Sequence, residues 1–153
     1  MSSYDTIRTD AWALSVPTDW TETLQESGTL YFESADGAKA MYVSTWRLGG
    51  DNLTSPKAVA DHLTAIGLTK LSDMSGYVWK TSPVSALHCE ESSIVTVDSY
   101  DEGRKYFIAQ KVLVRPPIVV RASFHDYASD DYQASREYFA PVIDSLQLPE
   151  PAV

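Results

Sequence analysis

The stretch YFIAQKVLVRPPIVVRASF, residues 106–124, predicts the centre of the molecule. Its first part, Tyr106–Val114, is apolar on both faces of an extended chain, because successive side chains of a strand point to opposite sides. A strand with two apolar faces is typical of the middle of a sheet that is covered on both sides. After Pro116 and Pro117, the alternating residues of Ile118–Phe124 predict a second strand. We therefore expect a sheet with packing elements on each face.

Five further segments predict strands, which are Trp12–Pro17, Thr29–Glu33, Lys39–Arg47, Tyr77–Lys80 and Ala86–Val97. The Asp36-Gly37 pair between the second and third of these is a strong turn signal, so these two are expected to form a hairpin. As one strand, Ala86–Val97 would span about 40 Å, which predicts a bulge or break near Glu90–Ser93. Strands joined by such short turns favour an antiparallel sheet, here of about six strands.

A first helix is predicted to begin at Ser55 and Pro56. Ser55 can accept a hydrogen bond as the N-cap residue, and proline is favoured at the first helical position. One helical stripe follows at positions i, i+3, i+4 and i+7: Val59, His62, Leu63 and Ile66. Gly67 is then the predicted end of the helix, because glycine is common just past a helix C-terminus.

A second helix is predicted after the cap formed by Ser129, Asp130 and Asp131. Its apolar stripe comprises Tyr132, Ser135, Phe139, Val142, Ile143 and Leu146. Pro141 lies inside this helix and is expected to kink or split it, because it removes the hydrogen bond to the carbonyl of Glu137. Both helices need a surface for their stripes, and the sheet supplies it. The sequence thus predicts one α+β domain over residues 1–153.

Composition excludes several classes of function. The chain has 21 acidic and 12 basic residues and a net charge of −9, which opposes binding to nucleic acid and to anionic membranes. No apolar run approaches the roughly 20 residues of a membrane span. The first ten residues, MSSYDTIRTD, lack the pattern of a secretory signal. Cys89 is the one cysteine, so a reducing cytoplasm is the expected compartment.

Two clusters contain residue types that bind metal ions. In a strand, His88 and Glu90 share one face and Cys89 and Glu91 the other, so only two ligands converge where structural zinc needs four. We expect an edge strand with solvated carboxylates and a buried, inert Cys89. The acids Asp98, Asp101 and Glu102 lack the spacing of a calcium loop, which favours a hairpin turn. No metal and no cofactor is expected.

Two further sets were tested for catalysis. Ser123, His125 and Asp126 are the residue types of a catalytic triad, but triad members usually converge from distant segments, and no nucleophile elbow surrounds Ser123. His62 lies on the apolar stripe of the first helix and is expected to be half-buried with a hydrogen-bond partner. The chain carries no phosphate-binding loop motif. The sequence therefore predicts no catalytic residues.

Aromatic residues give the strongest indication of a binding surface. In Lys39–Arg47, Tyr42 and Trp46 share one face, and Met41 and Val43 share the other. One face must meet the core, and the other is left to solvent. If Tyr42 and Trp46 are exposed, they form a plausible protein-binding surface, because Tyr and Trp anchor many interfaces. Burial of both in the core is nevertheless the favoured interpretation, because large aromatic side chains are usually mostly buried.

The order of these segments resembles the PsbP-like superfamily. ALSVPTDW, residues 13–20, resembles the opening strand, proline, turn and tryptophan of these domains. A hairpin ending in Tyr42–Trp46, a helix from Ser55 and a long meander follow in the same order. The closing YFAPVIDSLQL, residues 138–148, resembles the last helix of the superfamily.

The superfamily includes the photosystem PsbP proteins, a Ran-binding nuclear import factor, the DcrB proteins and chaperones of type VI secretion effectors. The resemblance implies an α/β/α sandwich around an antiparallel sheet and a function in protein–protein contact. It also implies a bacterial source. This chain shows no export signal of the kind that PsbP and DcrB carry, which counts against those two roles.

These observations favour a non-catalytic protein-binding module, such as a chaperone, an adaptor or an immunity-type protein. The alternative is a carrier that holds a small apolar ligand between sheet and helix, which predicts a cavity of several hundred Å³. An enzyme is the least favoured of the three. The expected partner is a protein of unknown identity, and the edges of the sheet also allow a homodimer.

Overall fold

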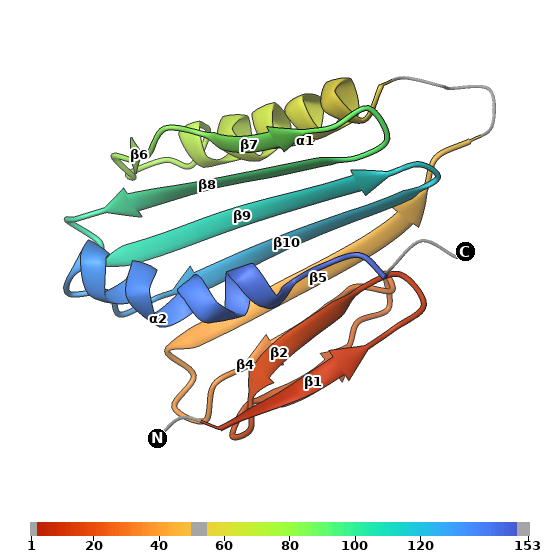
Figure 1. Cartoon of the computed structure of the whole chain (residues 1–153). Helices are drawn as coiled ribbons and strands as arrows, with labels where there is room; N and C mark the ends of the chain where they lie inside the picture. Colours follow the sequence, from red (N-terminus) through yellow and green to blue (C-terminus); the bar gives the residue numbers. More distant parts are fainter. Residues whose placement is uncertain (1–2, 50–54, 150–153) are drawn as a thin grey trace.

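A computed structural model describes residues 3–49 and 55–149 of the chain. Within them the chain forms a two-stranded sheet, an eight-stranded antiparallel sheet and two helices (Figure 1). The elements are β1 (Tyr4–Arg8), β2 (Ala13–Pro17), β3 (Thr21–Leu24), β4 (Leu30–Glu33), β5 (Lys39–Arg47), α1 (Pro56–Ser72), β6 (Lys80–Thr81), β7 (Ser85–His88), β8 (Ser93–Asp101), β9 (Tyr106–Arg115), β10 (Ile118–Asp126) and α2 (Tyr132–Ser145). No helix in the described ranges has the length and apolar character needed to cross a bilayer.

The α+β class and the antiparallel sheet are confirmed, but the sheet has more strands than the six expected. Its order is β3-β4-β5-β10-β9-β8-β6, and β7 also pairs with β8. The predicted break in Ala86–Val97 is a full turn, where the Cys89 amide donates to the Ser92 carbonyl at 2.8 Å. Strands β1 and β3 were missed because they are largely exposed and carry little apolar pattern.

The centre of the sheet lies where the sequence predicts it. Every residue of β9 from Phe107 to Val114 is buried, so both faces of this strand are covered. Helix α2 and the β1–β2 hairpin lie on one face, and α1 lies on the other (Figure 1). We call the side of α2 and β1–β2 the core face.

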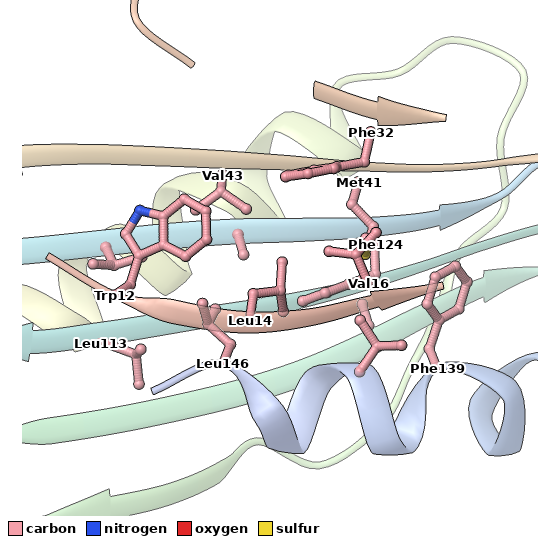
Figure 2. Packing of buried hydrophobic residues seen from close by; sticks show 14 of the residues in the cluster. Trp12, Leu14, Val16, Phe32, Met41, Val43, Leu113, Phe124, Phe139 and Leu146 are labelled. Atoms are coloured by element: carbon pink, nitrogen blue, oxygen red, sulfur yellow. The ribbon is translucent and has the colours of Figure 1, made fainter. Parts of the chain in front are cut away.

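Most of the large buried side chains gather on the core face. Trp12, Leu14 and Val16, which were predicted to share a face, are each at most 3% exposed (Figure 2). They fill the space between the large sheet and α2, where Phe139 is fully buried. The Trp12 indole N–H donates to the Thr45 hydroxyl of β5 at 3.0 Å, which satisfies its polar atom. The small sheet is therefore part of the main core.

Helix α2 begins as predicted, because the Asp131 carboxylate accepts a hydrogen bond from the Gln133 amide at 3.0 Å. The expectation that Pro141 would split this helix is wrong, since one helix runs from Tyr132 to Ser145. Pro141 and Glu137 both lie on the exposed side, where water can satisfy the carbonyl that loses its partner. At the other end, the Lys111 ammonium donates to the Ile143 and Leu146 carbonyls at 2.6 and 2.8 Å. A buried cation thus caps the helix C-terminus.

Helix α1 begins at the predicted cap, where the Ser55 hydroxyl accepts from the Ala58 amide at 3.2 Å. It does not end at Gly67 but continues to Ser72. Gly67 is buried because it faces the sheet, and a side-chain carbon there would lie 1.9 Å from Gln110 Oε1 of β9. The glycine therefore permits close packing instead of ending the helix.

The predicted stripe of α1 is displaced around the helix. Its buried face comprises Ala60, Thr64, Gly67 and Leu71. His62 is exposed, so the expectation of a half-buried histidine is wrong. Small residues were overlooked because apolar periodicity gives little weight to alanine, threonine and glycine.

Candidate functional site

In the part of the chain that the structure describes, no helix covers one half of the sheet face opposite the core. Helix α1 packs on β8 and β9, at one end of the sheet (Figure 1). Neither helix of the described ranges makes its main contacts with β4 or β5 on this side. We call this region the open face, and it is formed by the side chains of Tyr31, Tyr42, Ser44, Trp46, Arg121, Ser123 and His125.

Tyr42 and Trp46 are the two residues that the sequence singled out for protein binding. Both point to the open face, because Met41 and Val43 on the opposite side of β5 are buried in the core. Trp46 is 36% exposed and Tyr42 is partly buried. An exposed tryptophan on a sheet face without a helix is a feature that a partner can cover.

A continuous row of rings crosses this side of the sheet. Its members are Tyr31, Tyr42, His125, Tyr127, Tyr106, Tyr77 and Trp79, and we call them the aromatic row. Neighbouring ring centroids lie 4.8 to 6.1 Å apart, within the range of favourable aromatic contacts. The row connects β4, β5, β10 and β9 to the segment before β6. Sequence reasoning missed it because strand pairing, which the sequence does not reveal, brings these residues together.

The structure brings Ser123 and His125 together. The imidazole Nε2 lies 2.8 Å from the Ser123 hydroxyl, and Nδ1 lies 2.7 Å from the Tyr106 hydroxyl. Burial lowers the pKa of His125 to about 4. The ring is therefore neutral at pH 7 but a weak base, which makes it poorly suited to activate a serine.

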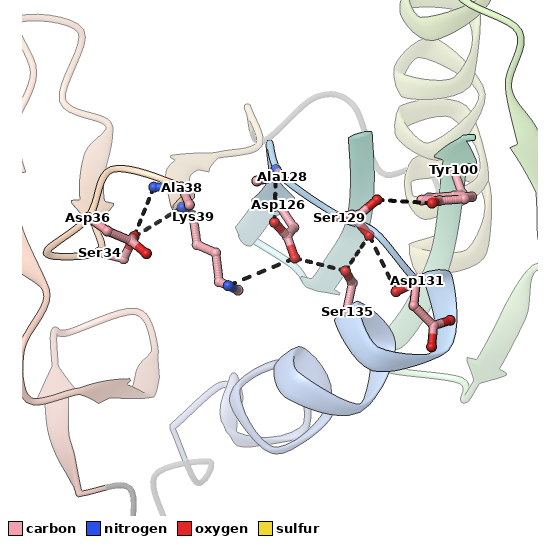
Figure 3. Close-up of polar contacts among 10 residues, drawn as sticks. All are labelled: Ser34, Asp36, Ala38, Lys39, Tyr100, Asp126, Ala128, Ser129, Asp131 and Ser135. Carbon is pink, nitrogen blue, oxygen red and sulfur yellow. Dashed lines mark hydrogen bonds and ion pairs between the residues drawn. The ribbon is translucent and has the colours of Figure 1, made fainter. Parts of the chain in front are cut away.

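Asp126 does not complete a triad, because it lies on the core face. Its carboxylate is 2.8 Å from the Ser135 hydroxyl of α2 and 3.9 Å from the Lys39 ammonium (Figure 3). Ser135 in turn contacts Ser129, whose carbonyl accepts from the Tyr100 hydroxyl at 2.9 Å. This buried network joins the end of β10 to the start of α2. The network links β10 to α2, and its carboxylate makes no hydrogen bond to His125.

Arg121 is the cation of the open face. It is partly buried, and burial lowers the pKa of its guanidinium. Its Nη2 lies against Gly67 of α1, 3.0 Å from the place a side-chain carbon would take. Among the described residues, no carboxylate lies within 4 Å of it. In contrast, the buried Lys111 has two carbonyl partners.

The residues considered as metal ligands lie apart from one another. His88 contacts Ser93, and its Nε2 lies 3.7 Å from Asp61 of α1. Cys89 is exposed at the tip of the β7–β8 hairpin, so the expectation of a buried thiol is wrong. Across residues 3–49 and 55–149, no three His, Cys, Asp or Glu side chains are placed to share a metal ion.

The three acids near the β8–β9 turn serve different parts of the structure. Asp101 accepts from the amides of Val78 and Arg104 at 2.8 and 2.9 Å, and these bonds lower the pKa of its carboxyl group. Asp98 lies on the core face and accepts from the Tyr132 hydroxyl at 2.5 Å. Glu102 lies 3.5 Å from the Lys80 ammonium at the surface. The expectation of a solvated turn therefore fails for Asp101, which is buried and holds the distant Val78.

A groove of about 610 Å³ lies on the core face between α2 and β8. Its volume fits the cavity expected of a ligand carrier. Its lining is mixed, with Phe107, Tyr132 and Ile143 beside the charged Asp98 and Arg136. Arg136 Nε lies 3.8 Å from the Asp98 carboxylate, and the carboxylate of Asp144 adds a further charge to the lining. Such a lining suits a polar molecule better than an apolar one.

Comparison with solved structures confirms the PsbP-like fold. The chain superposes on the solution structure of cyanobacterial PsbP (CyanoP) from Synechocystis sp. PCC 6803 with a TM-score of 0.68 and 11% identity, over 97% of this chain and 94% of that one. A protein of Bacteroides thetaiotaomicron VPI-5482 matches with a TM-score of 0.52 and 14% identity, over 91% of this chain and 45% of the other. No family model and no curated protein matches the sequence. At these identities the likeness concerns the fold alone.

Proposed function

We propose that this chain is a non-catalytic protein-binding domain that binds its partner through the open face. One observation carries the proposal: no helix of the described residues covers this half of the sheet, which presents Trp46, Tyr42 and Arg121 together. Tryptophan, tyrosine and arginine are the residue types enriched at the energetic centres of protein interfaces. The weak basicity of His125 and the position of Asp126 on the other face argue against an acyl-transfer enzyme at this site.

The acidic net charge and the exposed thiol of Cys89 support finer parts of the proposal. A reducing bacterial cytoplasm suits an exposed free thiol, which would be prone to oxidation outside. A chaperone, an adaptor or an immunity-type protein in that compartment would use such a face to cover a surface of its partner. A net charge of −9 would speed association with a basic partner.

A pull-down with the tagged chain from lysate of its source organism tests the proposal. We expect Trp46→Ser to reduce the captured partner at least ten-fold, because loss of a central interface tryptophan typically costs more than about 2 kcal/mol. Leu24→Ser is the matched control: Leu24 is 68% exposed on β3, away from the open face, and its replacement should leave capture unchanged. Equal capture by the wild type and by both variants would contradict the proposal.

The α2–β8 groove supports a second candidate function, a carrier of a small molecule. Native mass spectrometry of the purified chain would then show an added mass. Ala140→Trp, which places a bulky ring in the groove, should remove this mass. An unmodified mass in gentle conditions, with capture of a partner intact, would leave protein binding as the function.

A further inference from the structure

We infer that Arg121 recognises a single carboxylate, from an Asp or Glu side chain, in an extended segment of the protein partner. This inference rests on the proposed function, since it names what the open face binds. It goes further by assigning the central contact to one residue of β10 and one chemical group of the partner.

The first step is the position of Arg121 in the sheet. It stands opposite Ser44 of β5 and opposite Val112 of β9, so neither neighbouring strand presents an acid beside it. On the open face of β5 the side chains are Ala40, Tyr42, Ser44 and Trp46, which are all uncharged. Among residues 3–49 and 55–149, this arginine in the middle of the sheet has no acidic partner of the kind that a partly buried cation usually has.

The guanidinium of Arg121 lies against α1, and no group in the described part of the chain satisfies its donors. Gly67 of α1 supports it from one side, and no hydrogen bond or ion pair to the described residues uses its donors. Guanidinium carries five N–H donors in a fixed planar fork, which matches the two oxygens of a carboxylate. A preorganised fork loses less conformational freedom when it binds.

Two aromatic side chains flank Arg121 on the open face. Arg121 pairs with Ser44 of β5, and Tyr42 and Trp46 lie two residues before and two residues after Ser44 on the same face of that strand. A partner segment that covers both rings would exclude water from the guanidinium, and exclusion of water strengthens a charge-assisted pair. These neighbours favour a carboxylate flanked by apolar residues.

The net charge limits the number of acids in the segment. With a charge of −9 on the chain, each further carboxylate of the partner would be repelled. We therefore assign one carboxylate in an otherwise neutral or basic segment, and an extended conformation suits the flat face of β5 and β10.

The test selects peptides from a displayed library of random 12-residue sequences with the wild-type chain as bait. Selected peptides should share one Asp or Glu next to apolar residues. For the tightest peptide, Arg121→Gln and the peptide's Glu→Gln or Asp→Asn change should each weaken binding at least ten-fold. Combining the two changes should add little, because both remove the same contact. Circular dichroism and urea unfolding check that Arg121→Gln is folded. Arg121→Lys keeps the charge but not the planar fork, so its affinity for the peptide should lie between those of the wild type and Arg121→Gln.

Three outcomes separate the inference from the function on which it rests. The inference and the protein-binding function are both supported if the selected peptides share a carboxylate and its removal is energetically coupled to Arg121→Gln. Peptides that need Trp46 but show no acidic preference, or no coupling to Arg121, overturn the inference and leave the protein-binding function standing. If no peptide binds the wild type more tightly than Trp46→Ser, with Leu24→Ser again as the control, both are overturned.

Discussion

At the scale of single residues, His125 shows how burial changes a side chain's chemistry. Its ring is enclosed by Tyr42, Tyr106 and Tyr127, and its two nitrogens contact the hydroxyls of Ser123 and Tyr106. Burial disfavours the charged imidazolium, which lowers the pKa from 6.5 to about 4. The histidine therefore acts as a neutral hydrogen-bonding centre of the aromatic row.

This shift predicts how stability depends on pH. Since the pKa of the folded state is the lower one, the unfolded chain takes up the proton first, and stability falls as pH drops below 6.5. Between pH 7 and pH 5 we expect a loss of about 2 kcal/mol from this group. Urea unfolding of His125→Gln should show a smaller pH dependence in this window. The same replacement at the exposed His62 should keep the wild-type slope, and an unchanged slope in His125→Gln would refute the assignment.

The sequence anticipated the residue types of this site better than their arrangement. Tyr42 and Trp46 could be named because alternation along one strand puts them on one face. Which face is open depends on where α1 lies, and that placement is set by the contacts of Gly67 with Gln110. The Ser123–His125 contact follows from the same alternation, whereas the Tyr106 contact needs the pairing of β9 with β10.

At the scale of elements, the contact of α1 with β9 depends on a missing side chain. Gly67 allows Gln110 of β9, which is 7% exposed, to lie directly against the helix. A glycine inside a helix costs roughly 1 kcal/mol relative to alanine, so the close contact must offset that cost.

Replacing Gly67 tests this arrangement. Gly67→Ala should lower the free energy of unfolding by about 1–3 kcal/mol, because the new carbon overlaps Gln110 and the packed site has little room to adjust. In a Gln110→Ala background the same change should cost less, since the overlap with Gln110 is gone, the helix preference of alanine remains, and the 3.0 Å approach of Arg121 Nη2 is the tight contact left at this position. Urea unfolding of the four chains measures both effects. Equal destabilisation in the two backgrounds would show that Gln110 is not the cause.

Helix prediction from periodicity succeeded where polar caps mark an end and failed where small residues form the contact. Ser55 and Asp131 cap their helices as the sequence indicates. Gly67 was misread because the same residue serves equally at a helix end and at a close approach. Only the sheet that packs on α1 distinguishes these two uses.

At the scale of the whole molecule, the small sheet and the large sheet share one core. Leu14 of β2 is fully buried between α2 and the core face of the large sheet (Figure 2). The two sheets should therefore unfold as one cooperative unit.

Leu14→Ala tests this cooperativity. We expect a loss of about 2–5 kcal/mol with a single unfolding transition, because a large buried side chain is removed from the common core. Leu24→Ala, on the exposed strand β3, should change stability by less than about 0.5 kcal/mol. Tryptophan fluorescence, to which the buried Trp12 contributes, and the far-ultraviolet circular dichroism should report the same midpoint. Two separate transitions would show that the β1–β2 hairpin folds independently.

The α+β class of the molecule could be predicted because β9 is apolar on both faces and because two amphipathic helices must bury their apolar stripes against a sheet. The number of strands was not predictable, because β1 and β3 have exposed residues that give no alternating signal. The position of the open face could not be predicted from the sequence either, since it depends on which strands α1 covers.

The ends of the large sheet have a consequence for how the protein behaves at high concentration. One edge is β3, with four residues that include Glu22, and the other is formed by the short strands β6 and β7. Fibre growth needs a long, flat and uncharged edge onto which identical chains can stack. With so few backbone groups available at either end, the native fold offers a poor template for amyloid, and concentrated solutions should stay free of thioflavin-positive material as long as the chain is folded.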